Sequence, residues 1–254
     1  MNDTNLRFDF SGQTAVVTGG TRGLGRAVTE GLLEAGAAVH ATYRGNDAAA
    51  EAFKAGLPTA CAERLFLHRF DVADYAAVEA FWEGLEEAAP DGVQLLVNNA
   101  GIRRDGVLAM LSPEDWSSVI ETNLSSGYAM SKFAVQNMMR RGYGRIVFVT
   151  SPAGRFGFEG QGNYSASKAG QVGLSRSLSK EVAKRGITVN CVSPGFIDTE
   201  LLADLPEEQR KGYRQGVPLR RFGDPAEVAA SVLFLASKEA AYITGSTLEI
   251  SGGL

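Results

Sequence analysis

The segment TAVVTGGTRGLG, residues 14–25, decides the fold of this chain. Its first five residues form a mostly apolar run, typical of a parallel strand that is buried on both faces. The glycines that follow, in the spacing G-x-x-x-G-x-G, let the backbone turn sharply, and a helical pattern begins at Gly23. A strand that passes through a tight glycine turn into a helix is the start of a βαβ unit.

The alternation of strand and helix patterns continues to the end of the chain. The predicted strands are residues 14–18, 39–43, 65–70, 94–97, 145–150, 188–192 and 247–250. The predicted helices are residues 23–34, 47–55, 74–88, 113–140, 163–184 and 225–236. Ser112–Pro113 and Asp224–Pro225 each supply an N-cap residue followed by proline at the first helical position. We therefore expect an α/β protein with a single-domain Rossmann fold over residues 1–254, in which helices cover both faces of a doubly wound, seven-stranded parallel sheet.

Composition disfavours several classes of protein. The chain has 254 residues, 25 basic and 29 acidic side chains and a net charge of −4, so a nucleic-acid partner is not expected. No apolar run reaches the roughly 18 residues of a membrane span, and the chain does not begin with a signal-sequence pattern. Cys61 and Cys191 are expected to be buried thiols, and His40 and His68 lack the spacing of metal ligands. We expect a cytoplasmic protein without membrane contact and without a metal site.

The glycine loop at residues 19–25 indicates a dinucleotide site. Its glycines let the backbone approach a pyrophosphate, which would lie on the N–H groups and the positive dipole end of the following helix. The loop lacks the Gly-Lys-Ser/Thr end of a triphosphate-binding loop, and Val28 stands where a strict GxGxxG pattern has its last glycine. A glycine-rich turn without a ligand is the alternative interpretation.

The end of the second predicted strand indicates which dinucleotide would bind. NAD-binding proteins of this fold carry an acidic residue about 20 positions after the glycine loop, where it binds the ribose 2′-hydroxyl. This chain has TYRG at residues 42–45 instead. Arg44 and Arg22 would pair with a 2′-phosphate, which favours NADPH, although a single surface arginine is usually only solvated. By their positions after the third and fourth strands, Asp71, Val72, Asn99, Ala100 and Gly101 are further candidate contacts.

A second group of chemistry-bearing residues follows the fifth predicted strand. Tyr164 and Lys168 are four residues apart, so on a helix both lie on one face. Ser151 ends the fifth strand and would reach the same point. A free phenol has a pKa of about 10, and a neighbouring ammonium would lower it toward neutrality, a change of roughly 4 kcal/mol. The trio suits acid–base chemistry, although a Y-x-x-x-K pentapeptide also occurs on ordinary amphipathic helix surfaces.

As a set, these motifs resemble those of the short-chain dehydrogenase/reductase family. They are TGGTRGLG (18–25), NNAG (98–101), ETNLSS (121–126), Ser151, YSASK (164–168) and PG (194–195). The similarity covers essentially the whole chain. Within the family the chain most resembles 3-oxoacyl-[acyl-carrier-protein] reductases, in residues 101–108, 120–126, 144–151, 185–201 and 240–253.

The resemblance implies a role for each motif residue. Tyr164 would protonate a substrate carbonyl oxygen as hydride arrives from NADPH, and Ser151 would hydrogen-bond to that oxygen. Lys168 would bind the nicotinamide ribose and lower the pKa of Tyr164, and Asn123 would hold a relay water. The implied cofactor-binding residues are Gly19, Gly20, Thr21, Arg22, Gly23, Leu24, Gly25, Arg44, Asp71, Val72, Asn99, Ala100, Gly101, Tyr164, Lys168, Pro194, Gly195, Ile197 and Thr199.

The resemblance also implies an acidic protein partner, acyl carrier protein. Arg140, Arg141, Lys184 and Arg185 match the region where the family docks this partner. Gly142, however, stands where the family carries its second docking arginine. A basic cluster of this kind is also what the solvated C-terminus of a helix carries, which is the alternative interpretation.

The expected function is the NADPH-dependent reduction of a 3-oxoacyl-[acyl-carrier-protein] thioester to the 3-hydroxyacyl thioester, in fatty-acid or polyketide-type synthesis. By the same resemblance, residues 200–222 would form a lid, and the protein would be a homotetramer joined through helices 113–140 and 163–184 and the last strand. One alternative is a reductase or alcohol dehydrogenase that acts on another ketone. A non-enzymatic dinucleotide sensor is disfavoured, because all four candidate catalytic residues are present: Asn123, Ser151, Tyr164 and Lys168.

Overall fold

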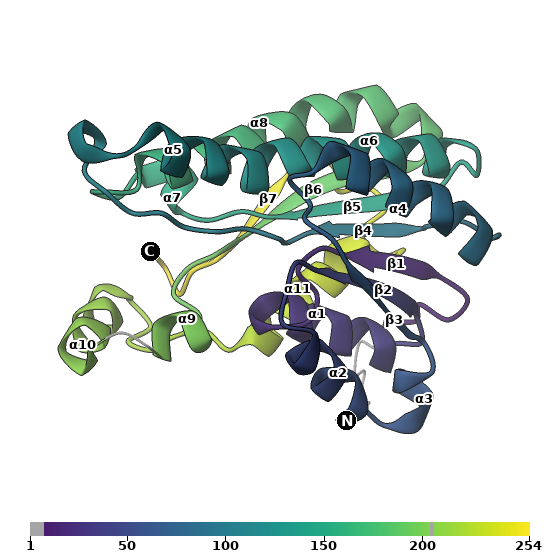
Figure 1. Ribbon diagram of the computed structural model, residues 1–254, viewed down its shortest axis with the longest axis horizontal. Helices are drawn as coiled ribbons and strands as arrows, with labels where there is room; N and C mark the ends of the chain where they lie inside the picture. The colour runs from purple at the N-terminus through teal and green to yellow at the C-terminus, as the bar shows by residue number, and fades with distance from the viewer. Residues whose placement is uncertain (1–7, 204–205) are drawn as a thin grey trace.

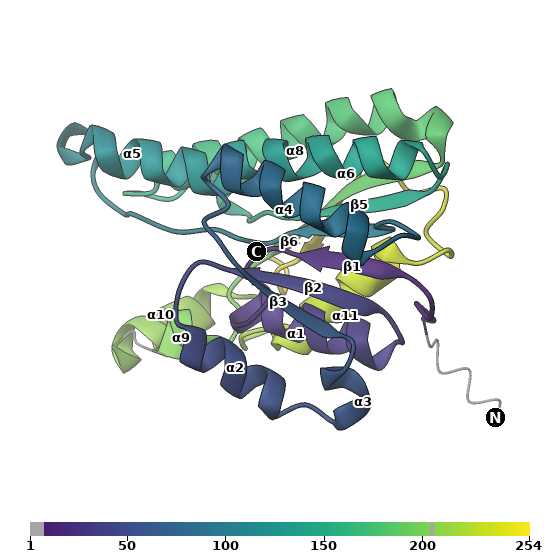
Figure 2. The same ribbon diagram turned by 45° about the vertical axis from the view of Figure 1, so that its right-hand side comes forward.

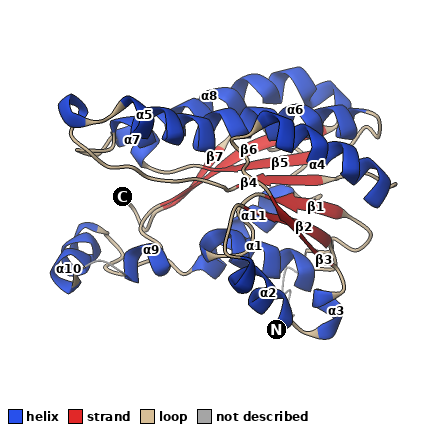
Figure 3. Ribbon diagram, in the orientation of Figure 1, coloured by secondary structure: helices blue, strands red, loops and turns tan. Residues whose placement is uncertain are grey.

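All seven strands lie in one parallel sheet, in the order β3-β2-β1-β4-β5-β6-β7, which confirms the predicted fold class (Figure 3). The computed structural model describes residues 8–203 and 206–254. The strands are β1 (Thr14–Val17), β2 (Ala38–Tyr43), β3 (Leu65–Arg69), β4 (Leu95–Asn98), β5 (Gly144–Val149), β6 (Ile187–Pro194) and β7 (Thr247–Ile250). The helices are α1 (Gly23–Glu34), α2 (Asp47–Ala55), α3 (Thr59–Ala62), α4 (Tyr75–Ala88), α5 (Pro113–Ile120), α6 (Ser126–Met139), α7 (Ala153–Phe156), α8 (Gly162–Val182), α9 (Glu200–Ala203), α10 (Glu207–Gly216) and α11 (Pro225–Ala236).

Helices cover both faces of the sheet (Figures 1 and 2). α4, α6 and α8 lie over one face, and α1 and α11 lie over the other. Successive side chains of a strand point to opposite faces, so Val17 and Val149 pack in the core beside α1 and α11, while Val16 and Phe148 pack beside α4, α6 and α8. Each such fully buried side chain stabilises the fold by about 1.5–3 kcal/mol. The two cores, one on each face, fix the sheet and with it the position of the edge where its strands end.

Several element boundaries agree with the sequence-based expectations. The helices predicted over residues 23–34, 47–55 and 225–236 have the same bounds in the structure. Ser112 and Asp224 cap α5 and α11 as predicted, because a side-chain oxygen of each accepts a hydrogen bond from the first turn of the helix. The short helices α3 and α7 were not predicted, since four residues are too few to show a helical period.

The prediction of one uninterrupted helix over residues 113–140 is wrong at its centre. α5 ends at Ile120 and α6 begins at Ser126, and a π-helical turn, η2 (Glu121–Ser125), joins them. This wider turn contains Asn123, whose side chain hydrogen-bonds to the loop after β4. Apolar periodicity detects the helix but not a single widened turn, which depends on a partner far away in the sequence.

The strand order reverses between β1 and β4. The chain runs outward from β1 to β3 and then returns to the other side of β1 at β4. In sheets of this kind ligands bind beyond the carboxyl ends of the strands at the point of reversal. The loops after β1, β4, β5 and β6 therefore define the place where a site is expected.

Four residues that the sequence singled out are buried or half-buried. Cys61 and Cys191 are free, buried thiols, as predicted. His40 and His68 pair with each other across β2 and β3, with 2.9 Å between Nδ1 of His40 and Nε2 of His68. His40 also stacks on Phe66, and burial lowers its pKa to about 4. The pair belongs to the packing of the outer strands.

Two further observations concern the part of the chain that the structure describes. In it, no group of three or more His, Cys, Asp and Glu side chains is placed to hold a metal ion. Within the same residues, none of the helices combines the length and apolar character needed to cross a membrane.

Candidate active site

The loops after β1 and β4 are fastened to each other where the strand order reverses. The Thr18 hydroxyl accepts hydrogen bonds from the backbone N–H groups of Asn99 (2.9 Å) and Ala100 (3.0 Å). The Asn99 side-chain amide donates to the carbonyl oxygens of Thr18 (2.9 Å) and Gly19 (3.2 Å). Only glycine fits at position 25, because a Cβ there would lie 2.1 Å from the Gly19 carbonyl oxygen. The predicted glycine loop is therefore a closely packed, fixed turn.

The start of α1 is suited to an anion. Arg22 is the N-cap residue of this helix and makes no side-chain capping hydrogen bond within the described residues. The first turn of the helix carries no acidic residue. Gly23 adopts φ +52°, and a Cβ built on it meets nothing within 4 Å, so the space beside it is open. The N–H groups and the positive end of the helix dipole thus face open space. These features fit the pyrophosphate of a dinucleotide.

Arg44 and Asp71 lie side by side at the carboxyl ends of β2 and β3. Nη1 of Arg44 is 3.7 Å from Oδ2 of Asp71, and 62% of the Arg44 side chain is exposed. An exposed pair of this kind contributes only about 0–1 kcal/mol, so the guanidinium remains available to another anion. Val72, the next residue, is buried. Three predicted residues thus lie together at the carboxyl ends of β2 and β3, on the same edge of the sheet as the glycine loop: Arg44, Asp71 and Val72.

Ser151, Tyr164 and Lys168 meet at the carboxyl end of β5. Ser151 follows β5, and Tyr164 and Lys168 lie one turn apart on α8. Nζ of Lys168 is 5.6 Å from the centroid of the Tyr164 ring. Ser151 lies close enough to the phenol to lower its pKa. The three residues that the sequence analysis grouped are thus neighbours in space.

The charge environment of Tyr164 differs from the expectation. Burial raises the pKa of the phenol above its usual value of 10, and the hydrogen bond with Ser151 and the nearby Arg103 guanidinium oppose this only in part. The expected lowering of this pKa by Lys168 is not found, because burial lowers the pKa of Lys168 to about 8 and the amine has lost its charge at the higher pH where this phenol ionises. The phenol is therefore held in its protonated form at neutral pH.

Lys168 is buried and held by two acceptors. Its Nζ donates to the carbonyl oxygen of Val149 (2.8 Å) and to the side-chain oxygen of Gln171 (3.3 Å). The Gln171 amide nitrogen donates in turn to the backbone oxygen of Asn123 (2.6 Å). Burial lowers the pKa of Lys168 to about 8. Gln171 is not among the predicted site residues, although its spacing from Tyr164 and Lys168 places all three on one helix face.

Asn123 is fully buried in the π-helical turn. Its Oδ1 accepts a hydrogen bond from the N–H of Ile102 (2.8 Å). Its amide nitrogen donates to the Ile102 carbonyl oxygen and to the Ser167 hydroxyl, each at 3.1 Å. Both amide hydrogens are thereby used. The side chain fastens the loop after β4 to α8 and offers no further donor to the relay water that the resemblance implied.

The loop after β4 also brings Arg103 to the site, which the sequence analysis did not single out. Its guanidinium carbon lies 5.9 Å from the centroid of the Tyr164 ring, and it forms an ion pair with Asp105. A signal was present in the sequence, because Arg103 and Arg104 follow the NNAG motif after a single intervening residue, Ile102, in the loop after β4.

The remaining predicted cofactor residues follow β6. Pro194 is the last residue of β6, and the N–H of Gly195 donates to the Ile250 carbonyl oxygen (2.9 Å). A Cβ at Gly195 would lie 2.9 Å from Cα of Ser251, so the chain needs glycine there. Ile197 is buried beyond this turn, which places it and Thr199 on the same edge of the sheet as the other loops.

The segment predicted as a lid, residues 200–222, lies next to this loop. It contains α9 and α10, which stand away from the main helical layers in Figure 1, while residues 204–205 of the segment lie outside the described residues. Tyr213 of α10 stacks on Phe196, with 4.6 Å between ring centroids and 12° between planes. The stack holds α10 against the loop that follows β6.

The predicted docking residues differ in what they contact. Arg140 forms an ion pair with Glu86 of α4, and Arg141 donates to a backbone oxygen of the loop after α4 (2.7 Å). Lys184 and Arg185 lie exposed in the 3-10 turn that follows α8. Arg140 and Arg141 therefore contact α4 and the loop after it, whereas Lys184 and Arg185 lie exposed at the surface.

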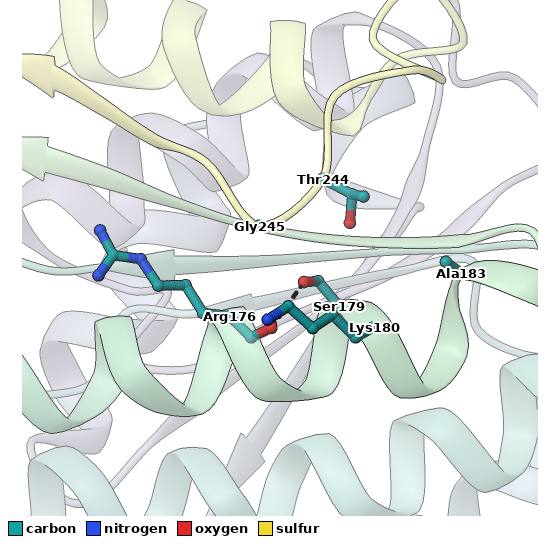
Figure 4. Close-up of a pocket in the computed structure, with 6 residues that line it drawn as sticks. All are labelled: Arg176, Ser179, Lys180, Ala183, Thr244 and Gly245. Carbon is teal, nitrogen blue, oxygen red and sulfur yellow. Dashed lines mark hydrogen bonds between the residues drawn. The ribbon is translucent and has the colours of Figure 1, made fainter.

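A pocket of about 400 Å³ lies apart from this site, between α8 and the turn before β7 (Figure 4). Arg176 in this pocket is twelve residues beyond Tyr164, about 18 Å along the helix. The Ser179 hydroxyl donates to the Arg176 carbonyl oxygen (2.9 Å), and the Thr244 hydroxyl accepts from the N–H of Val189 (3.1 Å). Its hydroxyl groups are thus already satisfied, and the pocket is separate from Tyr164 and Lys168.

Comparison with known proteins identifies the family of this chain. A family model described as "Enoyl-(Acyl carrier protein) reductase" matches residues 19–254. The chain belongs to the short-chain dehydrogenase/reductase family. It is therefore an enzyme of the oxidoreductase class, and the family implies a nicotinamide dinucleotide cofactor, which the glycine loop and the start of α1 fit.

Among similar members of the short-chain dehydrogenase/reductase family are reductases named for an acyl-carrier substrate. The chain is 45% identical over 246 residues to 3-oxoacyl-[acyl-carrier-protein] reductase FabG of Escherichia coli (strain K12), which covers 97% of this chain and 98% of that protein. It is 45% identical over 245 residues to the protein of the same name from Haemophilus influenzae, covering 96% and 99%. It is 40% identical over 247 residues to Nodulation protein G of Rhizobium sp. (strain N33), covering 97% and 98%.

Proposed function

We propose that the protein reduces a 3-oxoacyl thioester on acyl carrier protein to the 3-hydroxyacyl thioester, with NADPH as the reductant. The observation that carries the proposal is the meeting of Ser151, Tyr164 and Lys168 at the edge of the sheet where the strand order reverses. The high identity to full-length relatives with this activity in their names supports the choice of substrate.

The dinucleotide would lie along the carboxyl edge of the sheet. Residues 19–25 and the start of α1 would take its pyrophosphate, Arg22 and Arg44 its 2′-phosphate, and Asp71 and Val72 its adenine end. When bound, NADPH supplies a hydride to the carbonyl carbon of the substrate. The nicotinamide half would contact Asn99, Ala100, Gly101, Pro194, Gly195, Ile197 and Thr199.

Tyr164 would act as the general acid. Its raised pKa keeps the phenol protonated at neutral pH, so that a proton is available for the substrate oxygen when negative charge develops there. Ser151 would donate a hydrogen bond to the same oxygen and stabilise that charge. The carbon gains a hydride and the oxygen a proton, which together make the hydroxyl of the product.

Lys168 would bind the nicotinamide ribose and return a proton to Tyr164 after each turnover. Its pKa of about 8 is close to neutrality, so the amine can both release and regain a proton under ordinary conditions. Gln171 and Asn123 would act as positioning residues, because their hydrogen bonds fix Lys168 and the loop after β4.

The partners belong to the same proposal. Lys184 and Arg185 would receive the acidic carrier protein, with Arg140 and Arg141 at the edge of the contact. Residues 200–222 would cover the acyl chain as a lid. We also propose a cytoplasmic homotetramer, one domain over residues 1–254 in each subunit, joined through α5, α6, α8 and β7. The exposed apolar side chains of Tyr128 on α6 and Leu248 on β7 support such contacts.

The experiment that tests the proposal is Tyr164→Phe. This change removes only the phenol hydroxyl, so we expect the rate of NADPH oxidation with an acetoacetyl-carrier substrate to fall by a factor of about 100 or more, because a general acid contributes about 100- to 10,000-fold. NADPH binding, measured by fluorescence titration, should stay within about threefold. Near-normal turnover by this variant would refute the acid role.

A second candidate is a reductase for a different ketone, and Gly142 favours it. The family's second docking arginine is replaced there by glycine, and the neighbouring Arg141 is bonded to the loop after α4. Comparing kcat/KM for an acetoacetyl-carrier thioester with kcat/KM for a small unrelated ketone separates the two. Turnover of the free ketone alone would overturn the carrier-protein assignment while leaving the reductase chemistry in place.

A further inference from the structure

Arg103 and Asp105 lie beside the Tyr164 ring, on the loop that follows β4. The guanidinium carbon of Arg103 is 5.9 Å from the ring centroid. Arg103 Nε donates to Oδ1 of Asp105 at 3.3 Å, and Nη2 donates to Oδ2 of the same carboxylate. Oδ2 also accepts a hydrogen bond from the Gln161 side chain (3.3 Å), just before α8. The guanidinium is thus held over the ring by a carboxylate that is itself tied to the start of the helix carrying Tyr164.

The groups that face Tyr164 come from several elements. Ser151 after β5 lies close enough to the phenol to lower its pKa, and Lys168 on α8 lies 5.6 Å from the ring with its ammonium directed at other acceptors. Tyr213 of α10 lies close enough to Arg103 for their charges to interact. Arg103 stays charged across the whole working pH range, whereas Lys168 loses its proton near pH 8. The guanidinium is therefore the constant positive charge next to the phenol.

We propose that Arg103 and Asp105 form a positioning pair for Tyr164, in which the guanidinium holds the ring and stabilises the negative charge left on the phenol oxygen after proton transfer. Asp105 fixes the guanidinium and, through its own negative charge, limits that stabilisation. The inference rests on the proposed role of Tyr164 as the acid. Both charges have the required sign, since the Arg103 guanidinium lowers the pKa of Tyr164 and the Asp105 carboxylate raises it.

The two members of the pair should therefore act in opposite directions when they are neutralised. The Arg103 guanidinium lies about 6 Å from the ring, and at that distance and an effective dielectric constant of about 20 the loss of one charge shifts a pKa by roughly two units. Arg103→Gln should raise the pKa of Tyr164, and Asp105→Asn should lower it. Arg103→Lys keeps the positive charge, so the pKa of Tyr164 in this variant should be close to its value in the unchanged protein. We also expect kcat to fall several-fold in Arg103→Gln, because the ring loses its neighbour.

The direct measurement is the ionisation of Tyr164 in the whole protein. The chain has 7 tyrosines, and with Cζ-labelled tyrosine the NMR signal that Tyr164→Phe lacks is the signal of Tyr164. Its shift between pH 8 and 11 reports the ionised fraction in each variant. The pH profile of kcat/KM for the carrier substrate gives an independent reading of the same group. Arg104→Gln is the matched control, since Arg104 is the next residue and pairs with Asp115 instead.

The inference is supported if the ionised fraction at a given pH rises in Asp105→Asn, falls in Arg103→Gln and does not change in Arg104→Gln. It is overturned if the two variants move in the same direction or if neither moves. If Arg103→Gln fails to fold, the test rests on Asp105→Asn alone. In that case an unchanged or smaller ionised fraction of Tyr164 in Asp105→Asn overturns the inference. The proposed acid role of Tyr164 is tested separately, because it is refuted only if Tyr164→Phe retains near-normal turnover.

Discussion

The two halves of the carboxyl edge are built by different forces. In the cofactor half, the Thr18 hydroxyl and the Asn99 side-chain amide fasten the loops after β1 and β4 to each other, and Gly25 packs against them with no room for a single added carbon. In the catalytic half, Tyr164 lies among side chains from the loop after β4, the end of β5 and α8, and its properties follow from their charges and from burial. We therefore expect changes in the first half to alter binding and stability, and changes in the second to alter rate and pH dependence.

The largest effect should come from Gly25→Ala, which tests the packing of the cofactor half. The new Cβ would lie 2.1 Å from the Gly19 carbonyl oxygen and 2.5 Å from the Asn99 amide nitrogen, so the loop must move. We expect NADPH affinity, measured by fluorescence titration, to fall by about 1,000-fold, which equals about 4 kcal/mol. Gly173→Ala on α8 is the control, because its Cβ meets nothing within 4 Å. Equal affinities in the two variants would show that the close packing is not needed.

The second-largest effect should come from low pH, which should destabilise the outer strands β2 and β3 beside the cofactor half. Burial lowers the pKa of His40 to about 4, whereas an unfolded histidine has a pKa near 6.5. Between these values the unfolded chain binds more protons, so the free energy of unfolding falls as the pH drops from about 6.5 to about 4, by about 3 kcal/mol. Urea unfolding at several pH values should show this loss in the unchanged protein and a smaller one in His40→Gln. Identical pH dependence in both would contradict the assignment.

Gln171→Leu tests the hydrogen-bond network of the catalytic half. The change leaves Lys168 and the backbone oxygen of Asn123 with one partner fewer, and both are buried. An unsatisfied buried group of this kind costs about 2 kcal/mol, measurable by urea unfolding, and kcat should fall about tenfold as Lys168 loses its position. Gln136→Leu, at an exposed position of α6, should change neither quantity. If both variants behave alike, the network does not position Lys168.

The smallest effect should come from Arg44→Ala, which returns to the cofactor half at its exposed end. A charge-assisted hydrogen bond to a phosphate contributes about 1.5 kcal/mol, so NADPH affinity should fall about tenfold while NADH affinity is unchanged. Arg69→Ala removes another exposed arginine, which ends β3 and pairs with Asp47 at the start of α2, and should leave the ratio of the two affinities as it was. An unchanged ratio in Arg44→Ala would show that this residue does not read the 2′-phosphate.

The parts of the molecule that the sequence predicted share one property, which is that their cause is local. The alternation of strands and helices, the cap residues Ser112 and Asp224, and the glycine loop all follow from residues adjacent in the chain. The grouping of Ser151, Tyr164 and Lys168 was also predictable, because parallel strands end at one edge and residues four apart share a helix face.

The parts that the sequence did not predict depend on distant residues. The π-helical turn around Asn123 is held by Ile102 and Ser167, which lie 21 and 44 residues away. The direction of the Lys168 ammonium is set by Val149, 19 residues earlier. The ion pair of Arg140 is also non-local, since Glu86 lies 54 residues earlier. The ion pair between Arg103 and Asp105 lies in a loop, where no periodic pattern indicates it. Sequence spacing places such side chains on an edge or a face but does not tell which acceptor they choose.

The central claim is that the phenol of Tyr164, with Lys168 behind it, faces the reacting end of a bound nicotinamide dinucleotide. A crystal structure of the protein with NADP⁺ tests it most directly. We expect the Tyr164 hydroxyl to lie beside C4 of the nicotinamide ring, with Lys168 released from the Val149 carbonyl oxygen and bonded to the ribose. A structure in which the dinucleotide occupies the glycine loop while Tyr164 and Lys168 point away from the ring and the ribose would contradict the account.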